Sequence, residues 1–310
     1  MVYVCTLSKE LQEQAKRELN EDERRRDEDI EYIRKWIQKQ PHLKIRTDDA
    51  FILRMLRGCK FSLERTKEKV DMHYAFKTAL PEWFKNRDPN NKTVRDILKL
   101  GVFLPLKETD ADGRRIILFR QSSYNPDKHH MDDVLKAMYL VVDVFLETDE
   151  IYQITGVVLI LDMKGLTTGH MLQFPPTVMK KCMLLWQEGY AVRNKCQHYI
   201  NSSSLFETLY NAFKVFFKEK VRRRLKVYGS NYEVMYKEIP KRIMPKEYGG
   251  ETQTIQEITD HWLNIIDSKR KWILEEENYF VDESKRPEKP KKAEDLFGLA
   301  GSFRKLDNRQ

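Results

Sequence analysis

Few residues in this chain have the types and spacing that catalysis needs. His129-His130 is the one adjacent histidine pair, and its polar surroundings indicate a surface loop rather than a set of metal ligands. Residues 110–113 (DADG) resemble the start of a calcium loop, but its later acidic positions are missing, so they predict a hairpin turn. Residues 202–204 are serines without the Gly-x-Ser-x-Gly setting of a nucleophile. The sequence therefore predicts no catalytic residue and no enzyme.

Cysteine and histidine usage also argues against a metal or a cofactor. The four cysteines are scattered without the paired spacing of a zinc site or a disulfide framework: Cys5, Cys59, Cys182 and Cys196. This pattern is typical of free thiols in a reducing compartment. His198 lies in a predicted strand, where a hydrogen-bonded core histidine is expected. No apolar run reaches the 18 or so residues of a membrane span, and the first ten residues are too weakly apolar for a signal peptide. We expect a cytoplasmic protein.

The positive charge of the chain is concentrated in two segments. The formal net charge is +8, of which residues 190–226 hold +7 and residues 284–310 hold +4, while the remainder is net negative. A concentrated basic patch attracts an anionic surface, either a membrane or a nucleic acid, and the alternative is a solubilising face. Composition alone leaves these alternatives open.

An aromatic helical face directly precedes the strongest basic run. In residues 204–217, large apolar side chains recur at helical spacing: Leu205, Phe206, Leu209, Phe213 and Phe216. Six basic residues follow within residues 218–226. Such a segment can insert into a lipid interface while its charges hold anionic head groups. From periodicity alone, a core helix followed by a solvated charge run is the stronger interpretation.

The elements that must position these residues fall into two parts. Apolar residues recur at helical spacing up to about residue 90, where residues 88–91 (DPNN) predict a turn, so residues 1–90 are expected to form a helical domain. Beyond them, short apolar runs alternate with helical patterns. Residues 157–161 (VVLIL) are an unbroken apolar run, which is typical of a strand buried on both faces.

This alternation predicts an α/β fold with a mixed, mainly parallel sheet over residues 91–283. Strands are expected at residues 115–119, 157–161, 196–200 and 225–228, and helices at residues 132–146, 176–187, 204–217 and 254–276. Residues 284–310, which are rich in lysine and proline, are expected to be a basic, disordered tail.

Five segments in this order give the chain its resemblance to a known family. They are residues 48–61 (DDAFILRMLRGCKF), 112–115 (DGRR), 156–162 (GVVLILD), 198–201 (HYIN) and 245–250 (PKEYGG). Over about residues 25–275 the chain resembles the CRAL-TRIO family of lipid carriers, and within it the branch of tocopherol and retinaldehyde carriers. The resemblance implies a sheet that floors an apolar pocket and a helical gate, matched by residues 204–217, that covers it.

The resemblance also implies a membrane site. The tocopherol-carrier branch binds phosphoinositide head groups through four basic positions, which match Arg193, Lys195, Lys220 and Arg224. All four are basic here, although Arg and Lys are exchanged at the first two, which preserves charge but not bidentate geometry.

Three family prolines are absent from this chain. Ala191 stands before the first basic pair, residues 201–203 (NSS) replace Asn-x-Pro, and residues 214–216 (KVF) replace Lys-Pro-Phe. Loss of a proline from the gate helix changes its kink, so we expect gate motion or ligand shape to differ from those of the tocopherol and retinaldehyde carriers.

By the same matching, sixteen residues are expected to line the ligand pocket, and ordinary core packing is the alternative for each. They are Leu135, Met138, Val142, Val157, Leu161, Leu166, Phe174, Leu185, Trp186, Tyr190, Val192, Gln197, Leu205, Phe206, Leu209 and Phe213. Gln197 replaces an apolar residue, and its amide is a candidate partner for a ligand hydroxyl or carbonyl.

The sequence and the resemblance together predict a cytosolic carrier for one small hydrophobic lipid of the tocopherol, retinoid or carotenoid kind, a monomer that acts at phosphoinositide-containing membranes. Two alternatives share the fold: a phosphatidylinositol or other phospholipid transfer protein, and a signalling adaptor that carries nothing. Because the basic cluster adjoins a gate rather than a nucleic-acid motif, no nucleic acid is expected as a partner.

Overall fold

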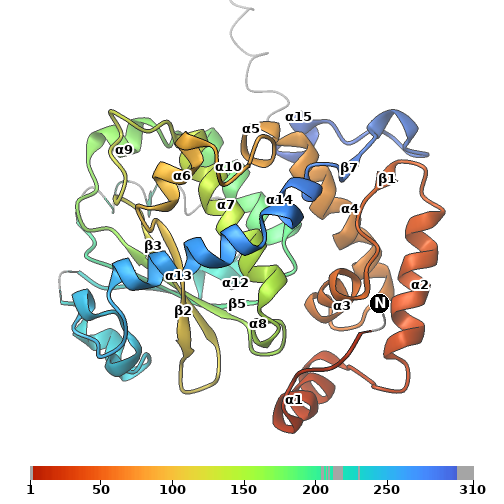
Figure 1. Cartoon of the computed structure of the whole chain (residues 1–310), viewed down its shortest axis with the longest axis horizontal. Coiled ribbons are helices and arrows are strands. Elements are labelled where there is room, and N and C mark those ends of the chain that lie inside the picture. Colours follow the sequence, from red (N-terminus) through yellow and green to blue (C-terminus); the bar gives the residue numbers. More distant parts are fainter. Residues whose placement is uncertain are drawn as a thin grey trace, which may run out of the picture.

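The computed structural model describes residues 3–203, 206, 208, 210–211, 219–229 and 231–298, without the side chains of residues 220, 221 and 232. Figure 1 shows two parts, a cluster of helices from the first third of the chain and a sheet covered by helices. The fold is the predicted α/β type.

The first part of the chain is helical, as predicted. Its helices are α1 (Lys9–Leu19), α2 (Arg26–Gln38), α3 (Asp49–Gly58), α4 (Leu63–Ala79), α5 (Pro81–Phe84) and α6 (Lys92–Leu98). Asp48 caps α3, its carboxylate accepting a hydrogen bond from the Phe51 amide at 2.9 Å. Gly58 permits a close approach to the second part, because a Cβ there would lie 2.6 Å from that of Ala191.

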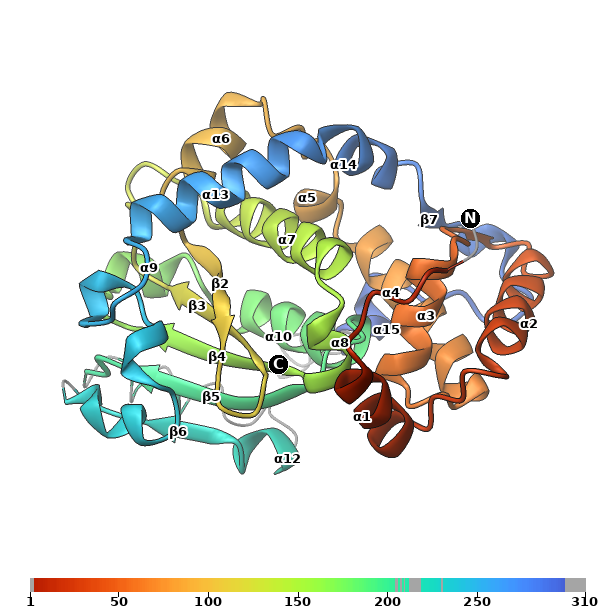
Figure 2. The ribbon, with the colours of Figure 1, turned by 60° about the horizontal axis from the view of Figure 1, so that its bottom comes forward.

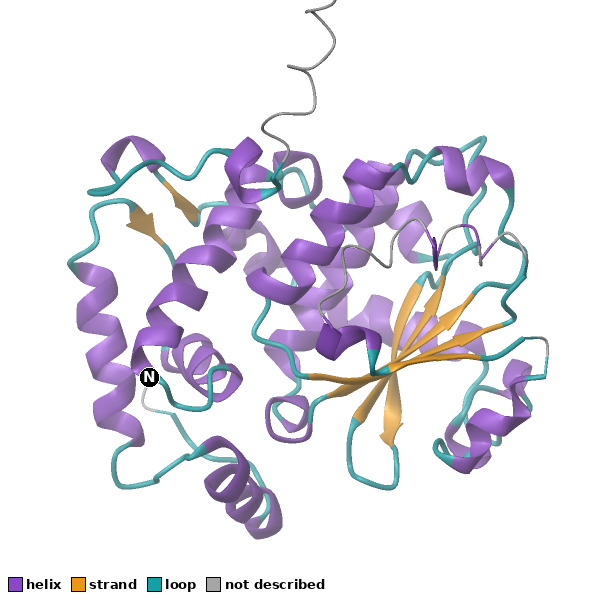
Figure 3. Ribbon diagram, turned by 180° about the vertical axis from the view of Figure 1, so that it is seen from behind, coloured by secondary structure: helices purple, strands orange, loops and turns teal. Residues whose placement is uncertain are grey.

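The main sheet has five strands in the order β2-β3-β4-β5-β6. They are β2 (Phe103–Thr109), β3 (Arg115–Arg120), β4 (Val157–Asp162), β5 (Asn194–Ile200) and β6 (Leu225–Val227). β2 and β3 form an antiparallel hairpin through the predicted turn at residues 110–113, and the remaining pairs are parallel. Every residue of β4 is buried, as its apolar run predicted. Figure 3 shows the strands of this sheet from behind.

Helices and short turns connect these strands and cover the sheet. The helices are α7 (Met131–Thr148), α8 (Ile151–Thr155), α9 (Thr168–Leu172), α10 (Pro176–Leu184), α12 (Glu219–Arg222), α13 (Ile255–Ser268) and α14 (Arg270–Glu276), with a π-helical turn, η1 (Leu185–Gly189), and the 3-10 turns η3 (Tyr232–Lys237), η4 (Lys241–Ile243) and η5 (Lys246–Tyr248). Figure 2 shows α13 lying along α7. A capping box formed by Thr254 and Glu257 begins α13.

A buried ionic cluster joins the two parts. The Asp143 carboxylate on α7 lies 2.7 Å from the Arg87 guanidinium and 3.0 Å from the Lys77 ammonium, and it accepts a hydrogen bond from the Tyr190 hydroxyl at 2.9 Å. Lys77 also reaches Glu276 of α14 at 3.4 Å. Charges so deep in the protein are tolerated because each one is paired.

The expected disordered tail differs from the structure over residues 284–298. This segment contains η6 (Glu283–Lys285) and α15 (Ala293–Leu296), and it follows a two-stranded sheet of β1 (Leu43–Lys44) and β7 (Phe280–Val281). Arg286 and Lys291 both bond to the Asp71 carboxylate, at 2.7 and 2.6 Å. Phe297 is fully buried against Phe76. Paired charges and a buried ring fix this segment; residues 299–310 lie outside the described residues.

Candidate ligand cavity and basic cluster

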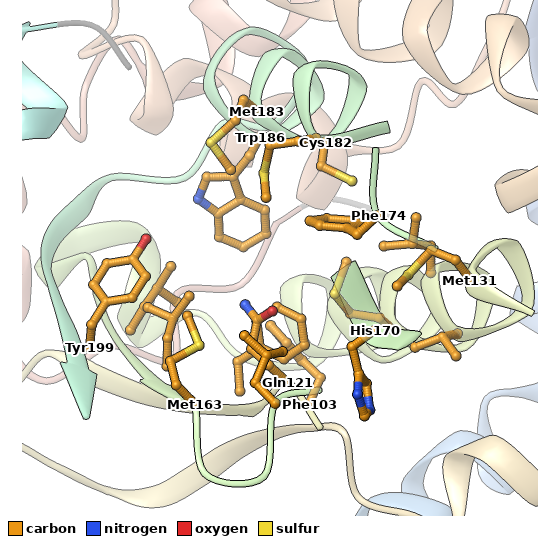
Figure 4. A pocket seen from close by; sticks show the side chains of 18 of the residues that line it. Phe103, Gln121, Met131, Met163, His170, Phe174, Cys182, Met183, Trp186 and Tyr199 are labelled. Atoms are coloured by element: carbon orange, nitrogen blue, oxygen red, sulfur yellow. The ribbon is translucent and has the colours of Figure 1, made fainter. Parts of the chain in front are cut away.

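An apolar cavity of about 150 Å³ lies between one face of the sheet and the helices α7, α9 and α10. Most of its lining is aromatic or aliphatic, and six methionines contribute: Met131, Met138, Met163, Met171, Met179 and Met183. Figure 4 shows several of these side chains converging with Phe174 and Trp186 on the interior. Because methionine is unbranched and flexible, this lining can adapt to the shape of a guest.

Eight of the sixteen residues predicted for the pocket line this cavity: Leu135, Met138, Leu161, Leu166, Phe174, Trp186, Gln197 and Phe206. They come from α7, β4, β5, the π-helical turn η1 that continues α10, and the segments between these elements. Side chains of widely separated segments therefore meet around one interior space.

Five predicted residues do not line the cavity, and for these the expectation is corrected: Val142, Val157, Leu185, Tyr190 and Val192. Val142 and Val157 lie on the expected faces of α7 and β4, but past the end of the cavity, and both are at most 1% exposed. Leu185 is buried in the main core, and Val192 is partly buried and packs against that core. The hydroxyl of Tyr190 donates to Asp143, which turns its ring into the ionic cluster.

The predicted gate lies largely outside the described residues. Leu205, Leu209 and Phe213 are among those not described. Phe206 is buried, its ring centroid lies 5.0 Å from that of Tyr199 on β5, and Tyr210 also lines the cavity. The two described aromatic residues of this segment thus contact the same cavity as the sheet.

Several lining residues were missed by sequence reasoning. Leu159 lies between Val157 and Leu161 at the strand period of two, so its face was predictable. Phe103 and Phe119 face each other across the β2–β3 hairpin and close one end of the cavity. Apart from Met138, which was predicted, the lining methionines carried no sequence signal, because nothing in their spacing distinguishes a cavity wall from a core.

Three polar side chains offer hydrogen bonds to a guest. The Gln121 amide points into the cavity (Figure 4). Gln197 also lines it, and its side-chain carbonyl accepts from the Tyr199 hydroxyl at 3.2 Å. The indole N–H of Trp186 is buried and has no hydrogen-bond partner among the described residues. An unsatisfied buried donor costs free energy, which a ligand oxygen would recover.

Three of the four basic residues predicted to bind a membrane lie beside the start of β5: Arg193, Lys195 and Arg224. The ammonium of Lys195 interacts electrostatically there with Arg193, Arg224 and Arg114, the last of which the sequence did not indicate. Burial lowers the pKa of Lys195, and the neighbouring positive charge of Arg193 lowers it further. Lys220 belongs to α12, but its side chain lies outside the described residues. Excess positive charge at such a site favours an anionic partner.

Each of these three bases already has a partner within the chain. Arg193 donates to the Gln153 carbonyl at 3.2 Å and lies 3.7 Å from the Glu18 carboxylate of α1, which is also 3.8 Å from Lys195. Arg224 donates to the Asn194 carbonyl. Arg193 therefore has a structural role, whereas Lys195 is held by a single weak ion pair.

The side chain of His198 lies in the core, as predicted. This residue is 1% exposed, and its Nδ1 lies 3.2 Å from the Tyr228 hydroxyl. All four cysteines are free thiols. Among the described residues, no helix is long and apolar enough to cross a bilayer.

Known proteins share this architecture. Residues 100–250 match the family model of the CRAL/TRIO domain, and residues 22–94 match that of the Pinta-like, UBA domain. The chain is 30% identical over 286 residues to the human alpha-tocopherol transfer protein-like protein, covering 92% of this chain and 80% of that one. The chain is 29% identical over 245 residues to clavesin-2 of the rat (Rattus norvegicus), and this match covers 79% of this chain and 75% of clavesin-2.

A solved structure agrees in fold. The crystal structure of Sfh5 superposes with a TM-score of 0.50 over 86% of this chain and 99% of its own, at 13% identity. Together with the family match and the 30% identity over most of the chain, this shows that the protein belongs to the CRAL/TRIO family of lipid-binding and lipid-transfer proteins.

Proposed function

We propose that this chain carries one small hydrophobic lipid, of the tocopherol, retinoid or carotenoid kind, through the cytoplasm as a monomer and exchanges it at phosphoinositide-containing membranes. It acts as a carrier and not as an enzyme. The observation that supports the carrier function most directly is the cavity, whose lining is apolar apart from a few polar groups. Such a lining suits a ligand with a long hydrocarbon body and one polar end.

Apolar burial can supply the affinity. A lipid that buries about 400 Å² gains roughly 10 kcal/mol before the costs of association, which is enough for submicromolar binding. The cavity of about 150 Å³ is smaller than the roughly 300–1,000 Å³ of typical small-molecule sites. Binding therefore requires the side chains that line the cavity, including the flexible methionines, to move apart.

The membrane function rests on residues that border the cavity. The segment matched to the gate, residues 204–217, contributes the buried Phe206 to the cavity and leads into the basic run that contains Arg224. On helix α9, which also lines the cavity, Leu172 is 83% exposed and follows the lining residue Met171 in the chain. An exposed leucine is costly in water but not in a lipid interface, so membrane contact should favour opening.

Native mass spectrometry of protein purified from its own cells, followed by organic extraction, tests the carrier function. One hydrophobic molecule per chain is expected, together with saturable submicromolar binding of one class in a screen of retinoids, tocopherols, carotenoids, sterols and phospholipids. Phospholipid binding alone would favour phospholipid transfer. No saturable binding in the whole screen would contradict the carrier proposal.

The size of the cavity favours one second candidate, an adaptor that uses the fold for protein contacts and carries nothing. A narrowed pocket is what such a role predicts. Enlarging the cavity with Met138→Ala separates the two. A carrier should bind its ligand with altered affinity in this variant, whereas an adaptor should bind no lipid before or after the change.

A further inference from the structure

The outer face of strand β5 carries three possible metal ligands. Cys196 and His198 are two residues apart on β5, so both face away from the cavity that Gln197 and Tyr199 line. Glu238 follows the 3-10 turn η3, which packs over this face. The Cys196 sulfur, one ring nitrogen of His198 and one carboxylate oxygen of Glu238 all lie within 4.8 Å of one another.

The surroundings of His198 favour metal binding. Its ring stacks on that of Tyr228, with centroids 5.7 Å apart and planes 8° from parallel, and its Nδ1 lies 3.2 Å from the Tyr228 hydroxyl. Such outer partners fix the orientation of a ligating ring.

One cation already touches the cluster. The Lys226 ammonium lies 2.5 and 2.6 Å from the two carboxylate oxygens of Glu238. Both side chains are about 40% exposed, and an ion pair between exposed groups contributes little stability. Lys226 can therefore turn into solvent, so a divalent ion with thiolate and imidazole ligands can replace it.

We propose that Cys196, His198 and Glu238 form a zinc-binding site on the outer face of the sheet, independent of the lipid cavity. Binding forms Zn–S, Zn–N and Zn–O bonds, and the thiol proton of Cys196 leaves to water. Two negative ligands neutralise the ion, and water takes the fourth position. Ligand atoms around tetrahedral zinc are roughly 3.3–3.8 Å apart, so shifts of about 1 Å complete the site.

The site would join β5 to η3. Met235 of η3 and Ile239, just after it, are buried in the main core.

The test uses the full chain, titrated with Zn²⁺ by calorimetry and with Co²⁺ by absorption. The expected results are one ion per chain and a thiolate-to-cobalt charge-transfer band. Cys196→Ser should remove the band and the binding, whereas Cys5→Ser, a matched loss of a thiol elsewhere, should retain both. Glu238→Gln should weaken binding at least as much as the roughly 10–100-fold that follows loss of an outer partner.

The Lys226→Met variant should raise the zinc affinity instead of lowering it. Without the competing ammonium, Zn²⁺ should bind more tightly, whereas a nonspecific surface site would be unaffected. Thermal unfolding without metal controls for folding, and the exposed Glu238→Gln variant keeps the test valid if Cys196→Ser unfolds. Zinc binding equal in the parent and Glu238→Gln proteins, or a cobalt band that persists in Cys196→Ser, would overturn the proposal.

Discussion

The Glu18 carboxylate on the first helix lies 3.8 Å from the Lys195 ammonium at the start of β5. Burial opposes the charged form of Glu18, but a hydrogen bond from Gln14 and the charge of Lys195 outweigh it and lower the pKa of the carboxyl. An acid of the N-terminal helices therefore neutralises part of the basic cluster that we propose binds phosphoinositides.

Removing this acid should strengthen membrane binding. Glu18→Gln leaves Lys195 and its neighbours without their counter-charge, and a charge near an anionic surface is worth about 1 kcal/mol, or roughly a fivefold gain in vesicle affinity. Co-sedimentation with phosphoinositide-containing vesicles measures it. Glu13→Gln, the same charge change at an exposed position of α1, is the control. Equal gains in both variants would mean that only net charge matters.

Removing two of the bases should have the reverse effect. Lys220→Ala combined with Arg224→Ala should cost about 2 kcal/mol of vesicle affinity, roughly thirtyfold, and less at high salt. Lipid binding without membranes should barely change, because Arg224 does not line the cavity.

The control for this pair is Lys35→Ala with Lys39→Ala, an equal charge loss on α2, away from the sheet. If the variant with Lys220→Ala and Arg224→Ala binds vesicles as well as the parent protein, the basic cluster is a solvated surface and not a membrane site. A parallel loss of lipid binding would mean that these residues support the pocket rather than the membrane contact.

Sequence patterns predicted the elements better than the site. The apolar run at residues 157–161 identified a buried strand, since burial on both faces leaves no polar alternation. Periodicity indicates which residues lie on the same face of a helix or strand, but it does not indicate how far a cavity extends along that face. Val142 and Val157 were therefore placed on the expected faces yet beyond the cavity. Tyr190 shows a second limit, because its partner Asp143 is 47 residues away in the chain.

The C-terminal tail also shows that local sequence patterns do not reveal long-range contacts. Its lysines and prolines are typical of disorder when only local composition is considered. The Asp71 carboxylate that holds Arg286 and Lys291 lies more than 200 residues earlier, and Phe297 fills a space beside Phe76. Long-range pairing of this kind has no local signature in a single sequence.

The amide of Gln121 should select for ligands with an oxygen. It points into an otherwise apolar cavity, so a hydroxyl or carbonyl group is its natural partner (Figure 4). Gln121→Leu should weaken binding of an alcohol or aldehyde ligand by about tenfold, since one hydrogen bond contributes about 1–1.5 kcal/mol. The matched hydrocarbon should bind equally well or better. Equal losses for both ligands would indicate a packing role instead.

The buried carboxylate of Asp143 should make the stability of the fold acid-sensitive. Burial favours its protonated form, but the charges of Lys77 and Arg87 outweigh burial and hold the pKa of this carboxyl well below its usual range. Because the folded-state pKa lies below the unfolded value of about 3.9, the stabilisation is fully present above about pH 5 and is lost as the pH falls through that range. Thermal unfolding at a series of pH values measures this effect.

Asp143→Asn isolates this carboxylate. The variant leaves Lys77 and Arg87 buried beside a neutral amide, which should lower the free energy of unfolding by about 3–5 kcal/mol at pH 7. It should also flatten the decline of stability below pH 5, because the group that takes up the proton is gone. Asp133→Asn, on the same helix but only half-buried, should change neither quantity appreciably. An unchanged acid profile in Asp143→Asn would assign the sensitivity to other carboxylates, such as Asp71 beneath the tail.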